Sequence, residues 1–234
     1  QGAMDGGGVC ADNANLTNCN FERNIIVGGF AAGGGARIGA GIVTGCTFRS
    51  NRVRADLNLA AFGGGLHIDR AGLVTHCMFI DNTADCNAAA RAGAISGFGS
   101  AILVSNCTLY GNHAATIERD SLFAVGGIDL SGGTVDHTIF YGTTGPAVSS
   151  RTSTTCCCFF ATSIGASLHG IDHGGNFSAD PLFCKGDAGA LLDLRLQTDS
   201  PCAPGRNPTD PRCGLLGAGI VGCGPLPGNN RSGN

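Results

Sequence analysis

The sequence is poor in charged residues, and lysine is almost missing from it. Charged residues make up 13% of the 234-residue chain, Lys185 is its single lysine, and the formal net charge is −3 with no run of basic residues. Binding of nucleic acid or of an anionic membrane surface depends on clustered lysine and arginine. Nucleic acid is therefore not an expected partner, and neither is an anionic membrane surface.

The chain also lacks tryptophan and long apolar runs. A membrane-spanning helix needs about 18 or more consecutive apolar residues, so no membrane span is expected. The chain starts at Gln1 without a methionine or a charged and then apolar leader, as a secreted protein does once its signal peptide has been removed. We therefore expect a secreted protein, extracellular or attached to a cell surface.

Glycine, in contrast, is abundant, with 40 residues, and 43% of the chain is apolar. No Gly-X-Y period occurs, which excludes collagen, and the alternating apolar stretches between the glycines differ from a flexible linker. The composition favours one large domain with a packed core.

A seven-residue pattern recurs four times, as NCNFERN, GCTFRSN, HCMFIDN and NCTLYGN. Its cysteines, Cys19, Cys46, Cys77 and Cys107, lie 27, 31 and 30 residues apart, and a further step of 30 reaches His137, where the pattern degrades. Glycine clusters such as GGGV, GGGA and GGGL precede the cysteines, and glycine suits a tight corner. A fixed period of this size indicates stacked units that cannot bury their apolar faces alone.

Apolar and polar residues alternate between the glycine cluster and the cysteine, which is the period of a half-buried strand. Leu66 and Ile68, for example, are expected to share the buried face. The opposite face is expected to carry Cys10, Arg37, His67, Ile95 and Asp129. Helical periodicity is absent, so the sequence predicts an all-β parallel β-helix, a solenoid of about 27–31 residues per coil.

Equivalent residues of successive coils lie about 4.8 Å apart in such a solenoid and form ladders. We expect cysteine and phenylalanine to fill the interior, the cysteines mainly as free thiols. Asparagine is expected at a corner, where it tolerates the αL conformation and hydrogen-bonds neighbouring backbone. The predicted ladder residues are Cys19, Cys46, Cys77, Cys107, Phe21, Phe48, Phe79, Asn24, Asn51, Asn82 and Asn112.

The repeat resembles the FxxN and GGA[ILV] repeats of chlamydial polymorphic outer-membrane proteins and related bacterial right-handed β-helices. FxxN is present in FERN, FRSN and FIDN, changes to LYGN, and is lost in IFYG, while GGA[ILV] is matched only loosely. The resemblance covers roughly residues 1–145 and implies a single right-handed parallel β-helix. Such repeats occur in adhesins and other surface proteins, so the resemblance implies no particular activity.

A change of composition divides the chain into β-helix repeats over 1–150, last coils with a closing module over 151–224, and an extended tail over 225–234. The closing module resembles the last coils of secreted bacterial β-helix proteins, which carry an ADPLF…SPC…CG pattern. Clustered cysteines in an exported protein indicate disulfides, whose pairing the sequence leaves open. The candidate disulfide cysteines are Cys156, Cys157, Cys158, Cys184, Cys202, Cys213 and Cys223.

No cofactor and no metal are expected. Cys77, Cys107 and His137 carry metal-binding atoms, but one residue per coil on a linear ladder does not converge on a tetrahedron. The cysteine triplet at 156–158 with Cys184 lacks CxxC spacing.

Polysaccharide cleavage on this fold would use carboxylates or a base on the outer face. The candidates are Arg37, His67 and Asp129 on one strip, with His76 and Asp136 on the next, although a solvated β-helix face accounts for them better, because no motif holds two carboxylates at a fixed spacing. No catalytic residue is assigned.

Two further patterns carry little weight. A threonine row for ice binding would use Thr47, Thr108 and Thr138, but Asn20 and Met78 interrupt it. The sequons at Asn15, Asn106 and Asn176 match NxS/T, a triplet that also occurs by chance.

The ends of a β-helix present unpaired backbone groups, so either the chain is part of a longer β-helix or a neighbouring subunit covers its end. The leading hypothesis follows the second option and is a secreted structural protein whose subunits stack head-to-tail into an extracellular or cell-surface filament. The tail over 225–234 is expected to dock on the adjacent subunit. The alternatives are a carbohydrate-active β-helix enzyme and a fragment of an adhesin-like surface protein, with surface polysaccharide as a second partner.

Overall fold

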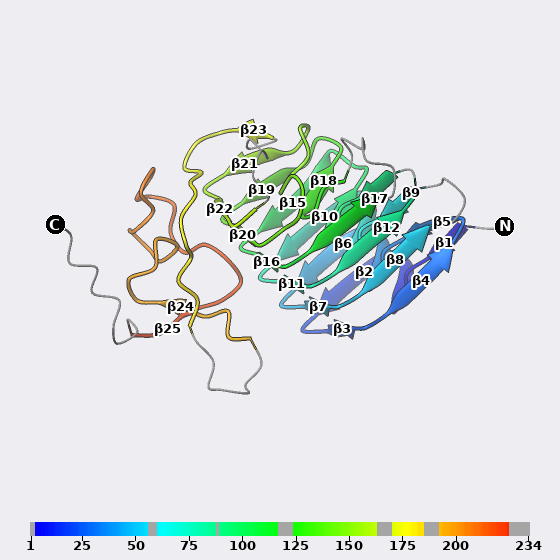
Figure 1. Ribbon diagram of the computed structural model, residues 1–234, viewed down its shortest axis with the longest axis horizontal. Coiled ribbons are helices and arrows are strands. Elements are labelled where there is room, and N and C mark those ends of the chain that lie inside the picture. The colour runs from blue at the N-terminus through cyan, green and yellow to red at the C-terminus, as the bar shows by residue number, and fades with distance from the viewer. Residues whose placement is uncertain are drawn as a thin grey trace.

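The computed structural model describes residues 3–55, 60–87, 89–116, 124–162, 170–184 and 192–224. In these ranges the regular elements are all strands, and they stack as a parallel β-solenoid of about six turns (Figure 1). The all-β solenoid predicted from the period of the sequence is confirmed. The predicted docking of the tail over 225–234 lies outside the described residues.

Each full turn of the solenoid passes through four sheets, A to D, in that order. Sheet A consists of β1 (Ala3–Asp5), β5 (Phe30–Ala32), β9 (Ala60–Phe62) and β13 (Ala89–Arg91). Sheet C consists of β3 (Asn20–Glu22), β7 (Thr47–Arg49), β11 (Met78–Ile80), β16 (Thr108–Tyr110), β20 (Ile139–Tyr141) and β22 (Cys158–Phe160). Sheet D consists of β4 (Ile25–Gly28), β8 (Arg52–Ala55), β12 (Thr83–Cys86) and β17 (His113–Thr116).

Sheet B is the largest and divides along its length. Its first three strands are long: β2 (Val9–Thr17), β6 (Ala36–Thr44) and β10 (Leu66–Thr75). The register between β6 and β10 shifts between Ile68 and Ala71. In the turns that follow β10, sheet B contains two shorter strands per turn, or only one. These strands are β14 (Ile95–Gly97), β15 (Ala101–Ser105), β18 (Ile128–Leu130), β19 (Thr134–Asp136), β21 (Ser153–Thr155) and β23 (Ile171–Asp172).

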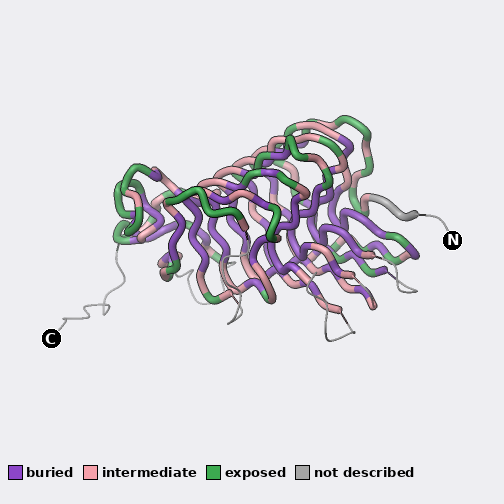
Figure 2. The backbone as a smooth tube through the Cα atoms, turned by 90° about the horizontal axis from the view of Figure 1, so that it is seen from above, coloured by how far each residue is buried: buried purple, intermediate pink, exposed green. Residues whose placement is uncertain are grey.

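The phenylalanines form a stacked column inside the solenoid. Phe21, Phe48 and Phe79 are register partners in adjacent strands of sheet C, and neighbouring ring centroids lie 4.7 Å apart with almost parallel planes. The column continues through Leu109 and Phe140. Figure 2 shows the buried stretches of successive coils lying one beside another along the molecule.

The asparagine ladder lies at the corner between sheets C and D and is hydrogen-bonded from coil to coil. The Asn51 side-chain nitrogen donates to Asn82 Oδ1 at 2.9 Å and to the Phe21 carbonyl at 2.8 Å. Asn82 repeats the arrangement toward Asn112 Oδ1 at 3.0 Å and the Phe48 carbonyl at 2.9 Å. The bonds tie each corner to the next coil and to the coil before it.

The prediction that these asparagines adopt the αL conformation is wrong, because the residue before each of them adopts it. The residue before each asparagine has positive φ, for example 55° at Arg23, 51° at Ser50 and 53° at Asp81. The asparagine can then direct its amide inward, where it replaces backbone partners that the turn cannot provide.

The cysteine ladder lies at the corner between sheets B and C, where Cys46, Cys77 and Cys107 are fully buried. Its next member is Thr138, whose hydroxyl accepts a hydrogen bond from the Cys107 backbone nitrogen at 3.3 Å. The step of 30 to His137 is therefore wrong by one residue. His137 takes the αL position of that corner, with φ of 44°.

The outward strip of sheet B also differs from the prediction at one residue. Ile95 is the register partner of Leu66 and is buried, while Ser96 pairs with His67 on the outer face. Ala92, Gly93 and Ala94 occupy the corner that Gly63, Gly64 and Gly65 occupy in the coil before, so Ile95, the first residue after the corner, faces inward as Leu66 does.

The closing segment, residues 177–184 and 192–224 of the described chain, lies at the C-terminal end of the solenoid (Figure 1). It contains the two-stranded sheet of β24 (Leu196–Gln197) and β25 (Val221–Cys223). Gly217 donates its backbone N–H to the His137 carbonyl at 2.7 Å, and Ala218 donates to Thr108 Oγ1 at 2.9 Å. The segment thus covers part of the outer face of sheet C.

Two disulfides fix the closing segment. Cys156 at a coil corner is bonded to Cys213, and Cys184 to Cys223. The prediction of disulfides is wrong for three of the seven candidate cysteines, which are buried thiols. Cys157 lies in the main core of the solenoid, and Cys158 and Cys202 lie in the apolar cluster beneath the closing segment.

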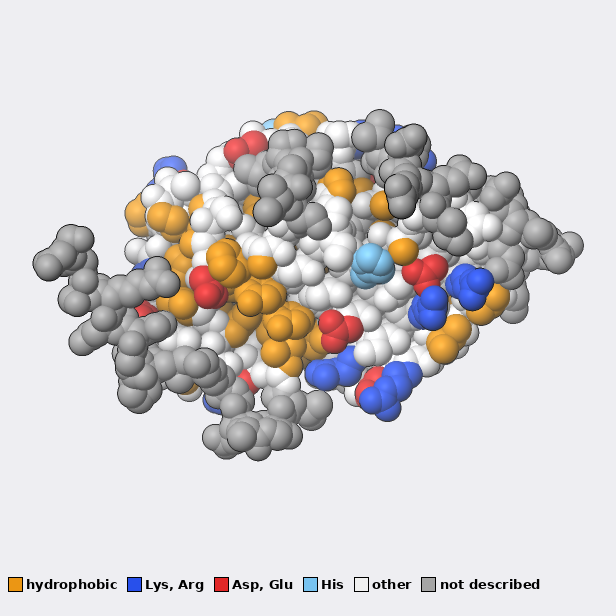
Figure 3. All heavy atoms as spheres, in the orientation of Figure 1, with side chains coloured by type: hydrophobic (Ala, Val, Ile, Leu, Met, Phe, Trp, Pro, Cys, Tyr) orange, Lys and Arg blue, Asp and Glu red, His pale blue; other side chains and the backbone are white. Residues whose placement is uncertain are grey.

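An aromatic column on the outer face of sheet C meets the closing segment. The rings of Tyr110 and Tyr141 are stacked with centroids 4.9 Å apart, and Phe160 continues the column. Phe183 of the closing segment lies 5.7 Å from the Tyr141 ring, and burial raises the pKa of Tyr110. A hydrophobic patch is visible on the face of the molecule shown in Figure 3.

Candidate functional site

The outer strip predicted from the sequence forms one register column across sheet B. Arg37, His67, Ser96 and Asp129 are Cα partners in β6, β10, β14 and β18. Asp69 lies two residues beyond His67 and contacts two members of the column. The strip is therefore a connected cluster rather than separate solvated side chains.

Asp69 is the centre of this cluster. Arg37 donates from Nε at 3.2 Å to both carboxylate oxygens and from Nη2 at 3.1 Å to Oδ1. His67 Nε2 lies 3.1 Å from Asp69 Oδ1, and His67 Nδ1 lies 2.6 Å from Ser96 Oγ. The hydrogen bond from His67, together with the Arg37 guanidinium, lowers the pKa of Asp69 to about 2.

Ser96, His67 and Asp69 carry the three groups of a hydrolase triad, but their placement does not suit nucleophilic catalysis. His67 and Ser96 are each 1% exposed, so a substrate carbonyl in solution does not reach Ser96 Oγ. The network instead holds the Asp69 carboxylate, whose side chain is 22% exposed, in one orientation.

Asp129, at the other end of the column, belongs to a second ion pair. Its carboxylate lies 3.8 Å from Arg91 Nη1, and the Arg91 guanidinium carbon lies 6.0 Å from the centre of the Phe62 ring. Asp69, Ser96 and Arg91 were not predicted from the sequence, because each meets a partner in another coil. The i, i+2 spacing of His67 and Asp69 within one strand was the available signal.

The other predicted outer residues do not join this cluster. His76 occupies an αL corner position, with Nδ1 2.8 Å from Thr75 Oγ1. Asp136 is the register partner of Ser105, which pairs with Thr75. The prediction that Asp136 shares a strip with His76 is therefore wrong.

The residues weighed as metal ligands are also separated. Cys77 and Cys107 point into the core, whereas His137 lies at the corner. In the described ranges, no group of three or more histidine, cysteine, aspartate or glutamate side chains could hold a metal ion.

The threonines considered as an exposed row do not form one. Thr47 and Thr108 share a column with Met78, and the next member is Ile139 rather than Thr138. Thr108 and Thr138 are fully buried.

The sequon asparagines use their side chains within the fold. Asn15 Oδ1 accepts from the Ile42 backbone at 3.1 Å, and Asn106 donates to the Leu215 carbonyl at 2.9 Å. Asn176 is buried and donates to Asp172 Oδ1 at 2.6 Å.

The N-terminal coil presents an open edge. The strands β2, β3 and β4 each pair with one neighbour, and no strand of the described residues pairs with their other side. Interior side chains of this coil, such as Leu16 and Phe21, keep some exposure, whereas Phe48 in the next coil has none. Ile25 on β4 is 65% exposed.

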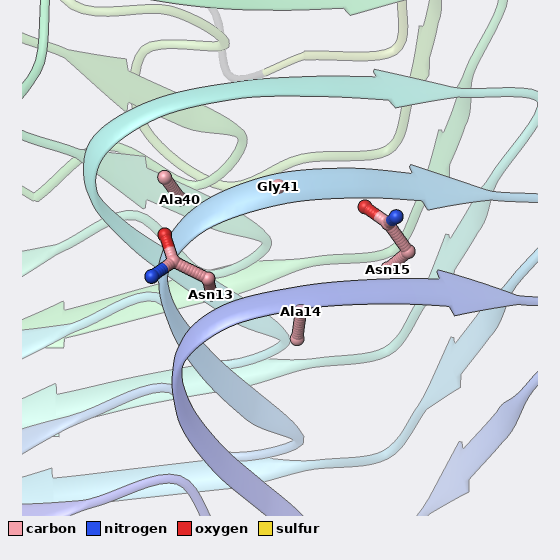
Figure 4. A pocket seen from close by; sticks show the side chains of 5 residues that line it. All are labelled: Asn13, Ala14, Asn15, Ala40 and Gly41. Carbon is pink, nitrogen blue, oxygen red and sulfur yellow. The ribbon is translucent and has the colours of Figure 1, made fainter.

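A shallow hollow of about 330 Å³ lies beside this edge, between β2 and β6 (Figure 4). Its lining includes the carboxamides of Asn13 and Asn15 and the small residues Ala40 and Gly41. A Cβ at Gly41 would lie 1.8 Å from the Ala14 carbonyl oxygen, so only glycine permits this approach of the two strands.

Comparison with known protein families, curated proteins and solved structures finds no match to this chain. In the part of the chain that the structure describes, no helix is long and apolar enough to cross a membrane.

Proposed function

We propose that the chain is a structural solenoid, exported from the cell, that associates with a second copy through its open N-terminal edge. The observation that carries the proposal is the row of unpaired backbone groups along β2, β3 and β4. Soluble proteins usually protect such an edge with lysine, proline or a covering element. These three strands contain no lysine and no proline.

The two ends of the solenoid differ, which bears on how copies associate. At the C-terminal end, β23 pairs with β21, and Phe177 exchanges backbone hydrogen bonds with Cys157 and Phe159 of the last full coil. The closing segment then stands beside this end (Figure 1), where Gly217 and Ala218 hydrogen-bond to the outer face of sheet C. Head-to-tail stacking into a filament needs both ends open, so we favour the pairing of two N-terminal edges.

Pairing of two N-terminal edges has a definite geometry. A twofold axis relates the copies, β2 of each copy runs antiparallel to β2 of the other, and the contact closes as a dimer. The added strands would satisfy the free N–H and C=O groups and bury the partly exposed core of the first coil.

Export is supported by the disulfides. Cys156–Cys213 and Cys184–Cys223 are the kind of covalent bond that persists in oxidising compartments outside the cytosol. A solenoid whose closing segment is fixed by disulfides in this way suits a durable extracellular assembly.

The test is the mass of the untagged protein in solution, measured by light scattering after size exclusion, with negative-stain electron microscopy of the same sample. We expect a dimer with twice the length of one solenoid. Ile25→Lys places a charge beside the edge and should give monomers, whereas Ile171→Lys, at a 52% exposed position near the other end, should leave the dimer intact.

Three outcomes would contradict the proposal. One is a wild-type monomer at all concentrations, and another is a dimer that Ile25→Lys does not weaken. Long fibres that both variants disrupt would instead support head-to-tail stacking.

A further inference from the structure

A small aromatic surface lies on the outside of the solenoid, where sheet A leads into sheet B. Its exposed rings are Phe30 and Phe98, which both pack on the buried Phe62 with ring centroids 5.0 and 5.1 Å away. Phe30 and Phe98 are 37% and 44% exposed, although large aromatic side chains are normally buried. The association proposed above uses neither ring.

Phe98 is held rigidly in its exposed position. Its backbone N–H donates to the Ile68 carbonyl at 3.2 Å, and its ring meets the ring of His67 edge to face at 4.9 Å. A Cβ at Gly99 would lie 1.4 Å from the Arg70 carbonyl oxygen, so the loop is pressed against the neighbouring coil. A ring fixed in this way loses little conformational entropy when a ligand covers it.

Two ion pairs adjoin the aromatic surface. Arg37 is paired with Asp69 on one side, and Arg91 is paired with Asp129 and lies over Phe62 on the other. The side chains of both arginines are 26% exposed. The surface therefore offers hydrogen-bond donors and acceptors next to each other, and each of these two arginines has a carboxylate beside it.

We propose that this surface binds an uncharged polysaccharide. A sugar ring has an apolar C–H face that can cover the Phe98 ring, and its hydroxyl groups both donate and accept hydrogen bonds. The Asp69 carboxylate, fixed by His67 and Arg37, can accept from one hydroxyl while the Arg37 guanidinium donates to its neighbour.

The charges and the size of the surface argue against other partners. A polyanion would need arginines without adjacent carboxylates, and a polycation would need the reverse. A stable protein interface buries about 800 Å² per partner around an apolar core, whereas this surface is one aromatic trio flanked by ion pairs.

The experiment measures binding of the intact protein to cellulose, chitin and glucomannan, with polygalacturonate as the anionic control. We expect the wild-type protein to bind at least one uncharged polysaccharide. Phe98→Ala should bind it with an affinity at least roughly tenfold lower, the loss usual for an aromatic anchor. Phe30→Ala is the second test variant. Ile171→Ala, at a similarly exposed apolar position on β23, is the matched control and should bind normally.

The inference is overturned if no uncharged polysaccharide binds, if polygalacturonate binds most tightly, or if both phenylalanine variants bind like Ile171→Ala. It is independent of the dimer, because Ile25→Lys should still bind polysaccharide.

Discussion

Replacing one asparagine inside the ladder should destabilise the protein much more than replacing the first one. Asn82 is fully buried; its amide donates to the Phe48 carbonyl and to Asn112, and its Oδ1 accepts from both nitrogens of Asn51. Asn82→Ala removes all four hydrogen bonds and leaves the buried Asn51 backbone N–H without this acceptor. With about 0.5–1.5 kcal/mol for each of the four bonds, we expect a loss of about 2–6 kcal/mol.

Asn24 provides the matched control, because it has the same chemistry at the open end of the ladder. It is partly exposed, and its side chain donates to Asn51 Oδ1 at 2.9 Å. Asn24→Ala should therefore cost about 1 kcal/mol. Denaturant unfolding followed by circular dichroism gives both values from the midpoints and slopes. Equal losses of unfolding free energy at the two positions would refute the view that the ladder stabilises the protein through hydrogen bonds between coils.

Three further predictions concern titration, disulfides and thiol reactivity. Because the pKa of Asp69 is lower in the folded than in the unfolded protein, its carboxylate contributes to the free energy of unfolding above the unfolded pKa, and this contribution is lost as pH falls through about 2. The stability difference between wild type and Asp69→Asn, measured by denaturation, should therefore shrink between about pH 4 and pH 2. Cys213→Ser opens a link that spans 57 residues and should cost about 4 kcal/mol, with faster proteolysis within the closing segment than within the coils, as seen by mass spectrometry. The exposed Cys10 should react with iodoacetamide in the native protein. Cys77 should react only after unfolding, because a hydrogen bond to Cys107 and burial raise its pKa to about 12. Rapid alkylation of Cys77 in the native protein would contradict this.

The repeat period was sufficient to predict the solenoid, because each coil repeats the same inward residues. The error at His137 arose where the spacing changes, because Thr138 follows Cys107 after 31 residues. Ile95 and Ser96 exchanged places in the prediction although their corner keeps its length, because in a strand of period 2 an error of one residue in register reverses the two faces.

The outer cluster was predicted only in part, for a different physical reason. Alternation places Arg37, His67 and Asp129 on the outside, but it carries no information about which side chains meet across coils. Asp69 is 32 residues from Arg37, and the register shift in β10 decides that they meet. The disulfide pairs depend on the path of the closing segment, for which the sequence offers no period.

The ladders and the outer cluster place opposite constraints on how the chain can change length. Inside, the ladder asparagines and phenylalanines of the middle coils meet a similar residue in each neighbouring coil, so deletion of the coil from Cys46 to His76 would set Asn24 against Asn82 with the same bonds available. Outside, the contact of Arg37 with Asp69 joins two particular coils and would be lost. The number of coils can therefore vary at little cost to the core, whereas the coils that carry the outer cluster must stay adjacent.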